Sequence, residues 1–182
     1  MSPHRTPEAP VELTRWTVTT GSNVNSRAAV VLHTGAHTWD ASAEGNGALD
    51  ALFRAVDRAL DEVLDGSPRL VAYDVHALAE GPSAEGRVEV TVMVPEAAEG
   101  SRAGGRFTGE ATSTNVIAAS LTAYVAALNA MLADPSWAGA AAEAGSRRGP
   151  RPGAGAVHPS AAEFDDDEGI LDPGDWFNRV AE

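Results

Sequence analysis

The sequence predicts an α+β fold made of two successive strand–strand–strand–helix (βββα) units, with the helices packed on antiparallel sheets. Three observations support this prediction. Three short segments with β-type patterning are followed by one long segment with helical periodicity. The same series of four segments then occurs a second time. Gly66 and Pro68, which are typical of helix ends, separate the two series.

In the first unit, three strands are expected to precede a helix. The strands should lie at residues 16–20, 28–32 and 38–43. The first alternates large residues with Thr, the second is a short apolar run, and the third has its apolar residues on one side. These are the patterns of half-buried or buried strands. After them, Asn46 can cap a helix and Gly66 can end it.

The first helix is amphipathic. Its apolar face carries leucine and valine residues: Leu49, Leu52, Val56, Leu60, Val63 and Leu64. Its opposite face carries acids and arginines: Asp50, Arg54, Asp57, Arg58, Asp61 and Glu62. This spacing is typical of a helix that lays one face on a core and turns the other to water.

The second unit repeats the order of the first. The expected strands are residues 70–78, 87–94 and 106–112. The middle one alternates strictly between apolar and polar residues, and a Gly-rich hairpin precedes the last. Ser113 or Thr114 can cap a second helix that continues to about Leu132.

The second helix carries no charged residue between Ala111 and Ala133. A helix on the surface of a monomer shows a charged stripe, as the first helix does. We therefore expect the second helix to be buried on more than one side, against its own sheet and against a second copy of the chain, which predicts a homodimer. The alternative is that the C-terminal tail of the same chain folds back over it.

The two ends of the chain differ in composition from this central part. Residues 1–13 are Pro-rich and polar, and we expect a disordered leader before a folded domain at residues 14–134. Residues 135–182 are expected to form a disordered Ala/Gly/Pro linker and an acidic tail. Apolar residues interrupt the acids of residues 163–182, so this stretch is either a docking peptide for a protein partner or a solvated tail.

Charge and composition exclude several classes of protein. The formal net charge of -13 argues against nucleic-acid binding. The sequence has no apolar run long enough to span a membrane, and its first residues do not resemble a signal peptide. It contains no cysteine, which excludes disulfides and thiolate metal sites. We therefore expect a cytoplasmic protein that binds neither membrane nor nucleic acid.

Three stretches of the sequence resemble a known family. Residues 45–52 (GNGALDAL), 73–78 (YDVHAL) and 109–129 (GEATSTNVIAASLTAYVAALN) are similar, in the same order, to segments of the C-terminal regulatory domain of 2-isopropylmalate synthase. The resemblance covers roughly residues 15–133. It implies paired βββα units that dimerise and bind the feedback inhibitor leucine at the dimer interface. Related enzymes such as citramalate synthase share the domain, so the resemblance defines the fold more closely than the effector.

The catalytic barrel of these synthases has no counterpart in the sequence, because a (β/α)₈ barrel needs about 200 residues or more. The resemblance therefore implies a stand-alone regulatory or ligand-sensing dimer and not an enzyme of the family's mechanism. It would bind a branched-chain amino acid, or a related small amino or keto acid, and act on a partner. The alternative is a diverged protein of a biosynthetic pathway that uses the same pocket for another role, catalysis included.

The resemblance also implies an effector site. The positions that match the family's effector-facing residues are Leu49, Asp50, Leu70, Tyr73, Ala77, Ala84 and Thr112. Tyr73 would offer a hydroxyl group beside an aliphatic side chain, a combination that suits an amino acid. The sequence departs from the family's usual residues at Ala48, Ala72, Ala111 and Thr112, which leaves the specificity for leucine open.

Other chemistries find no support in the sequence. The Gly45-Asn46-Gly47 stretch lacks the Lys-Ser/Thr or third Gly of phosphate-binding loops, and Asp50 would repel an anion, so we interpret it as a turn and helix cap. His33 and His37 flank an expected hairpin turn and have too few neighbouring ligands for a metal site. His76 has no nucleophile at a recognisable spacing. We therefore predict no catalytic residue, no metal and no cofactor.

Overall fold

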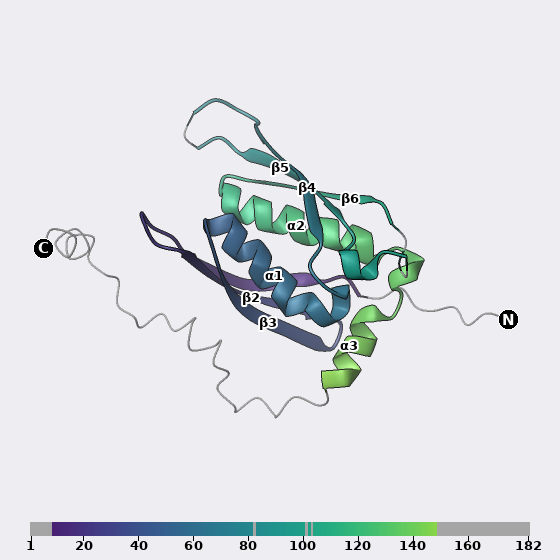
Figure 1. Ribbon diagram of the computed structural model, residues 1–182. Helices are drawn as coiled ribbons and strands as arrows, with labels where there is room; N and C mark the ends of the chain where they lie inside the picture. The colour runs from purple at the N-terminus through teal and green to yellow at the C-terminus, as the bar shows by residue number, and fades with distance from the viewer. Residues whose placement is uncertain (1–8, 82, 101, 103, 149–182) are drawn as a thin grey trace, which may run out of the picture. The chain divides into compact units, whose positions relative to one another are not determined.

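A computed structural model describes residues 9–81, 83–100, 102 and 104–148, all within one compact unit (Figure 1). The first repeat consists of β1 (Glu12–Thr19), β2 (Ser26–Thr34), β3 (His37–Gly45) and α1 (Ala48–Leu64). The second consists of β4 (Arg69–Ala77), β5 (Gly86–Met93), β6 (Arg106–Ser113) and α2 (Val116–Leu132), with the 3₁₀ helix η1 (Glu96–Ala98) after β5. A second 3₁₀ helix, η2 (Pro135–Trp137), and α3 (Ala140–Arg148) follow. The predicted α+β fold of duplicated βββα units is confirmed.

Each repeat forms its own three-stranded antiparallel sheet. The strand orders are β1-β2-β3 and β4-β5-β6, so each strand pairs with its neighbour in sequence. β2 and β3 are joined by a tight turn, because Thr34 pairs with His37. Gly35 adopts a φ of 58° in this turn, which costs a glycine little. The hairpin turn predicted between the two histidines is confirmed.

The duplication includes an irregularity in the first strand of each sheet. The pairing register shifts at Thr14 in β1 and at Val71 in β4, so each strand contains a β-bulge near its start. After the bulges, Trp16 and Tyr73 take equivalent positions, each opposite a buried valine of the central strand. The first strands of the two repeats therefore correspond residue by residue.

The two helices lie between the two sheets, and each packs mainly on the sheet of its own repeat (Figure 1). α1 covers β2 and β3, and α2 covers β5 and β6. The fully buried side chains that the sheets contribute include Val30, Leu32, Trp39, Val88, Val90 and Val92. Together with the buried faces of α1 and α2 they form one continuous hydrophobic core.

The helix α2 is buried on two sides within a single chain. Its second side packs on α1, β1 and η2. Phe53 of α1 stacks on Tyr124 of α2, with ring centroids 4.3 Å apart. The first repeat, and not a second copy of the chain, therefore covers this side, so the lack of charge in α2 is not evidence for a dimer.

The polypeptide is already ordered before the predicted first strand. The backbone N–H of Val11 donates to Asn129 Oδ1 at 2.7 Å, and Asn129 Nδ2 donates to the Val11 carbonyl at 2.8 Å. Val11 is buried, and β1 begins at Glu12. The disordered leader expected for residues 1–13 is thus contradicted at residues 11–13, because Asn129 of α2 bonds to the backbone of Val11 and residues 12 and 13 pair with β2. Residues 1–8 lie outside the described residues.

Gly109 allows β6 to approach α2 closely. A Cβ atom at this position would collide with the helix backbone at Ala123 and Ala127. The backbone of the strand and the backbone of the helix are therefore in contact, with no side chain between them. A larger residue here would push the helix away from its sheet.

The two helices begin in different ways, and both caps differ from the prediction. Asn115, and not Ser113 or Thr114, caps α2: its Oδ1 accepts from the N–H groups of the two residues at positions 117 and 118, each at 3.1 Å. Gly47 is the N-cap of α1 and makes no side-chain cap bond. Asn46 contributes only its backbone N–H, which donates to Asp50 Oδ2 at 2.9 Å. The sequence predicted both caps to within one or two residues but could not fix where the chain leaves the preceding strand.

The structure contradicts the disordered linker that was expected from residue 135. Residues 135–148 form η2 and α3, and Trp137 is fully buried. Three alanines of α3 are buried as well. The rest of the expected linker and the docking peptide expected at residues 163–182 lie outside the described residues.

Candidate effector site

Tyr73, the central residue of the predicted effector site, points from β4 to α2. Its hydroxyl lies 2.7 Å from Ser120 Oγ, and Ser120 Oγ donates to the Val116 carbonyl at 2.6 Å. Because a serine has one hydroxyl proton, Tyr73 must be the donor to Ser120. The Tyr73 oxygen therefore keeps its acceptor capacity. Sequence reasoning missed Ser120, although a buried serine in an uncharged helix implies a polar partner.

Asp50, in the first turn of α1, is already engaged within its own helix. One carboxylate oxygen accepts from the Asn46 N–H, and the other accepts from Arg54 Nε at 2.8 Å. The Asn46 hydrogen bond, with a further contribution from Arg54, lowers the pKa of Asp50 below its ordinary value. Asp50 is therefore a stable negative charge at the start of α1, next to the half-buried Leu49.

The remaining predicted residues divide between the two faces of the second sheet. Tyr73 and Ala77 pair with Val90 and Gly86 and share the face that looks to α2. Thr112 is exposed and pairs with Arg87, which is out of phase with the buried valines of β5. The structure therefore does not bring Thr112 together with Tyr73.

The surroundings of Tyr73 and Ala77 are apolar and open. The large side chains of β4 and of the residue after it are between 40 and 53% exposed: Leu70, Val71, Val75 and Leu78. The pairing puts Leu70 and Val75 on the face that looks to α2, whereas Leu78 follows Ala77 and points to the opposite face. We call these four residues, which lie along both faces of the strand, the β4 apolar surface. Near its end, Val75 and Val116 both lie close to Gly86, where a Cβ atom would touch them. Ala84 is half-buried in the loop before β5, where its N–H donates to the Gly81 carbonyl at 3.2 Å.

The predicted site residues at the start of α1 and those on β4 beside α2 lie at the same end of the helix layer. α1 and α2 run side by side and begin at the same end (Figure 1), and Tyr124 of α2 contacts Phe53 and Asp57 of α1. Leu49 in the first turn of α1 and Tyr73 beside Ser120 in α2 are therefore on the same side of the repeat interface. No cap side chain occupies the start of α1.

A titratable pair that sequence reasoning missed lies between the two helices. Tyr124 Oη donates to Asp57 Oδ1 at 2.5 Å, and Tyr124 is almost completely buried. Burial raises the pKa of Asp57 to about 7, to which the charge of Asp61 adds, although the Tyr124 hydrogen bond opposes the rise. The helical pattern had placed Asp57 on the solvated face. Only the position of α2 turns it into an interface residue.

Metal ligands do not gather in the part of the chain that the structure describes: no group of three His, Asp or Glu residues could hold an ion. His33 Nδ1 lies 3.4 Å from Thr38 Oγ1, and His37 lies against α3. Among the described helices, none is by itself long and apolar enough to cross a membrane. Only α2 and the segment after it, taken together, have the length and apolar composition of a membrane span, and a bend of 87° separates them.

Comparisons with known proteins agree with this architecture. Residues 3–132 match the family model described as the LeuA allosteric (dimerisation) domain. The chain is 42% identical over 91 residues to 2-isopropylmalate synthase of Salinibacter ruber, covering 50% of this chain and 14% of that protein. It is 36% identical over 110 residues to 2-isopropylmalate synthase of Sediminispirochaeta smaragdinae, covering 60% and 19%. It is also 33% identical over 122 residues to a putative (R)-citramalate synthase of Methanoculleus marisnigri, covering 67% and 22%.

Proposed function

The chain belongs to the LeuA allosteric (dimerisation) domain family, and on this basis we propose that it is an effector-sensing dimer that regulates a partner protein. The effector is a branched-chain amino acid or a closely related small acid. The chain matches only about a fifth of the length of the synthases named above or less. The proposal therefore concerns the regulatory role and not the synthase reaction.

The β4 apolar surface is the observation that carries the proposal. Monomeric proteins rarely leave several large apolar side chains exposed on one edge strand without a partner. Here they flank Tyr73 and Ala77, two of the residues that the family resemblance assigns to the effector. A second copy that covers this surface would place the effector residues at a subunit boundary. Dimerisation and ligand binding would then involve the same strand.

The chemistry around Tyr73 suits a zwitterion with an apolar side chain. The Tyr73 oxygen can accept from an ammonium group. The uncapped N–H groups at the start of α1 can donate to a carboxylate, because Arg54 offsets the negative charge of Asp50 that would otherwise repel it. Leu49 and Ala77, which lie toward the starts of α1 and α2, supply apolar surface for an aliphatic side chain. Leu70 lies roughly 20 Å from Ala77 along β4, so one ligand cannot contact both within a single chain. Asp50 is a weaker candidate for the ammonium group because Arg54 already pairs with it.

Ligand binding is tested by calorimetry and thermal unfolding of the full chain with L-leucine, L-isoleucine, L-valine and their 2-oxo acids. A ligand that binds only the folded state must raise its melting temperature. Ala77→Phe should abolish the rise by placing a ring on the face of β4 that carries Tyr73, whereas Ala36→Phe, in the exposed β2–β3 turn, should preserve it. No rise with any of these acids at millimolar concentration would refute the effector role.

The dimer is tested by sedimentation of Val75→Asp against Val24→Asp. Both residues are exposed valines, but only Val75 belongs to the β4 apolar surface, since Val24 lies between β1 and β2. Val75→Asp should shift the wild-type dimer to the monomer, because it places an unpaired charge in the interface. Val24→Asp should sediment as the wild type does. A wild-type monomer at micromolar concentration would contradict the proposal.

A further inference from the structure

Residues 135–148, which we call the strap, lie beyond the end of the family match and bind to both repeats. The 3₁₀ helix η2 packs on α2, and α3 packs on α1 and β3. Trp137 is completely buried, and three alanines of α3 are buried with it. The strap therefore packs across the boundary between the two repeats.

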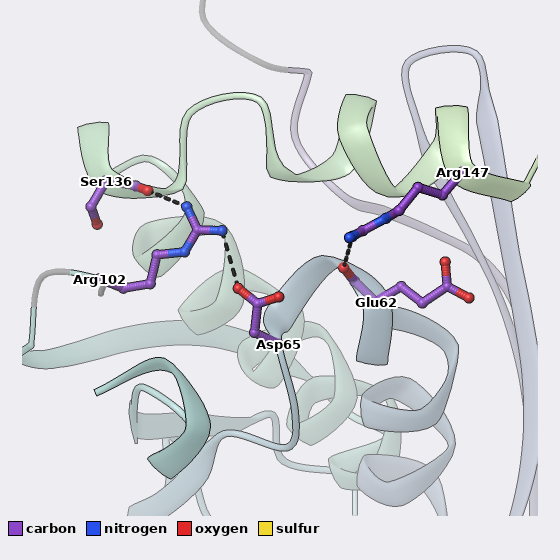
Figure 2. Close-up of polar contacts among 5 residues, drawn as sticks. All are labelled: Glu62, Asp65, Arg102, Ser136 and Arg147. Carbon is purple, nitrogen blue, oxygen red and sulfur yellow. Dashed lines mark hydrogen bonds and ion pairs between the residues drawn. The ribbon is translucent and has the colours of Figure 1, made fainter. Parts of the chain in front are cut away.

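Two arginines fasten the strap to the C-terminal end of α1 (Figure 2). Arg102, before β6, donates to the Ser136 carbonyl and pairs with Asp65 at 3.1 Å, and its guanidinium lies 4.7 Å from the centre of the Trp137 ring. Arg147 of the strap donates to the Glu62 carbonyl at 3.1 Å. The last turn of α1 has no basic residue of its own. These arginines therefore supply the positive charge that a helix C-terminus favours.

The fit between α3 and the β2–β3 hairpin depends on a glycine. A Cβ atom at Gly145 would collide with the imidazole ring of His37. Glycine inside a helix is unfavourable because it gains backbone freedom when the helix unfolds. Its presence in α3 is explained by the close approach to His37, so the sequence of α3 suits the docked position better than it suits a free helix.

The strap has few polar contacts with the rest of the described chain, and those contacts are partly exposed to water. α3 is only nine residues long, and isolated helices of this length are not stable in water. The Arg102 and Asp65 side chains are 22% and 43% exposed. Trp137 Nε1 is buried without a hydrogen-bond partner among the described residues, which weakens the seat of the indole ring. Segments with this combination of features open locally before the core does.

We propose that the strap is a dissociable clamp, which binds in cis across the two repeats and opens as one unit while both sheets, α1 and α2 remain folded. When closed, it links the end of α1 in the first repeat to Arg102 in the second. It thereby fixes how the repeats meet at this end of the helix layer. The proposal rests on contacts far from Tyr73 in the sequence and does not depend on the effector role.

Hydrogen exchange of the full chain tests the clamp. In the wild type, the amides of α3 should be protected, but less than those of α1 and α2. Arg102→Gln should accelerate exchange in α3 by about tenfold or more, the scale expected for losing charge-assisted hydrogen bonds, without changing α2. Arg106→Gln, at an exposed arginine at the start of β6, should have no effect. Unchanged exchange in Arg102→Gln, or equal acceleration of α2, would overturn the proposal.

A second pair of variants tests the seat of α3. Gly145→Ala raises helix propensity but places a methyl group against His37, so exchange in α3 should become faster. Adding His37→Ala makes room for the methyl group, so the double variant should exchange more slowly than Gly145→Ala alone. Slower exchange in Gly145→Ala alone would show that α3 is not seated on His37.

Discussion

Replacing Asp57 with Asn should make the stability of the protein less dependent on pH. In the wild type, Asp57 is half-buried between α1 and α2 and accepts from the hydroxyl of Tyr124, and its pKa is about 7 instead of the ordinary 3.8. The folded state therefore holds a proton that the unfolded state releases between these two pH values. This stabilising contribution is fully present below about pH 4 and is lost as the pH rises through about 7.

The size of the effect follows from the pKa difference. Each pKa unit corresponds to 1.36 kcal/mol, so the contribution that the wild type loses between these pH values is at most about 4 kcal/mol. Asparagine cannot ionise, and its Oδ1 can still accept from Tyr124. Asp57→Asn should therefore exceed the free energy of unfolding of the wild type by about 1 kcal/mol near pH 4.5 and by on the order of 2–4 kcal/mol at pH 8.

Urea unfolding followed by circular dichroism, at pH 4.5 and pH 8 and at one protein concentration, measures this difference. Asp61→Asn is the control, because Asp61 is exposed one helical turn further along α1 and should change the free energy by much less. A constant difference between Asp57→Asn and the wild type at both pH values would refute the reasoning. It would mean that Asp57 ionises in the folded protein as it does in the unfolded chain.

Two further pairs of variants test the packing and the helix ends. Gly109→Ala should lower the free energy of unfolding by about 1–3 kcal/mol, because the methyl group collides with the backbone of α2. Gly104→Ala is the control: a Cβ atom there meets nothing within 4 Å, so its thermal melt should be close to that of the wild type. Asn115→Ala should cost about 1 kcal/mol through the lost cap of α2. Asn46→Ala should cost almost nothing, because only the backbone of Asn46 is used at the start of α1, and an equal loss in both variants would contradict the caps described.

The order of the strands and helices could be predicted because periodicity is a local property of the sequence. The alternation along β5 and the helical spacing of α1 each fix which face is buried, and the repetition of the series reveals the duplication. The residue that caps a helix is harder to predict, because it depends on where the preceding strand leaves its sheet. Asn46 and Asn115 are both suitable caps, yet only Asn115 has the backbone position that lets its side chain reach back.

Features that join distant parts of the chain could not be predicted. Asn129 satisfies the backbone of Val11, and Tyr124 makes Asp57 a half-buried interface acid, but no local pattern links these residues. Composition was also misleading for the strap, because an Ala- and Gly-rich stretch seemed to have little to bury. Trp137, which packs against Arg102, and three alanines of α3 are nevertheless buried in it. In the candidate site, the resemblance supplied Tyr73, whereas only the register of β5 and β6 shows that Thr112 faces the other way.

The bulges at Thr14 and Val71 have a consequence for solubility. β1 and β4 are edge strands, and an edge strand offers unpaired backbone groups to any extended segment of another molecule. A bulge breaks the even spacing of these groups and increases the local twist, so an added strand cannot follow the whole edge. On β4, regular pairing with an outside strand is confined to the residues after Val71, the stretch that contains Tyr73. The duplicated bulge thus limits fibre-like growth at β1 and β4, two of the four described edge strands. Deleting Val71 would lengthen the edge of β4 that is open to such growth and would turn the neighbouring side chains to the opposite face.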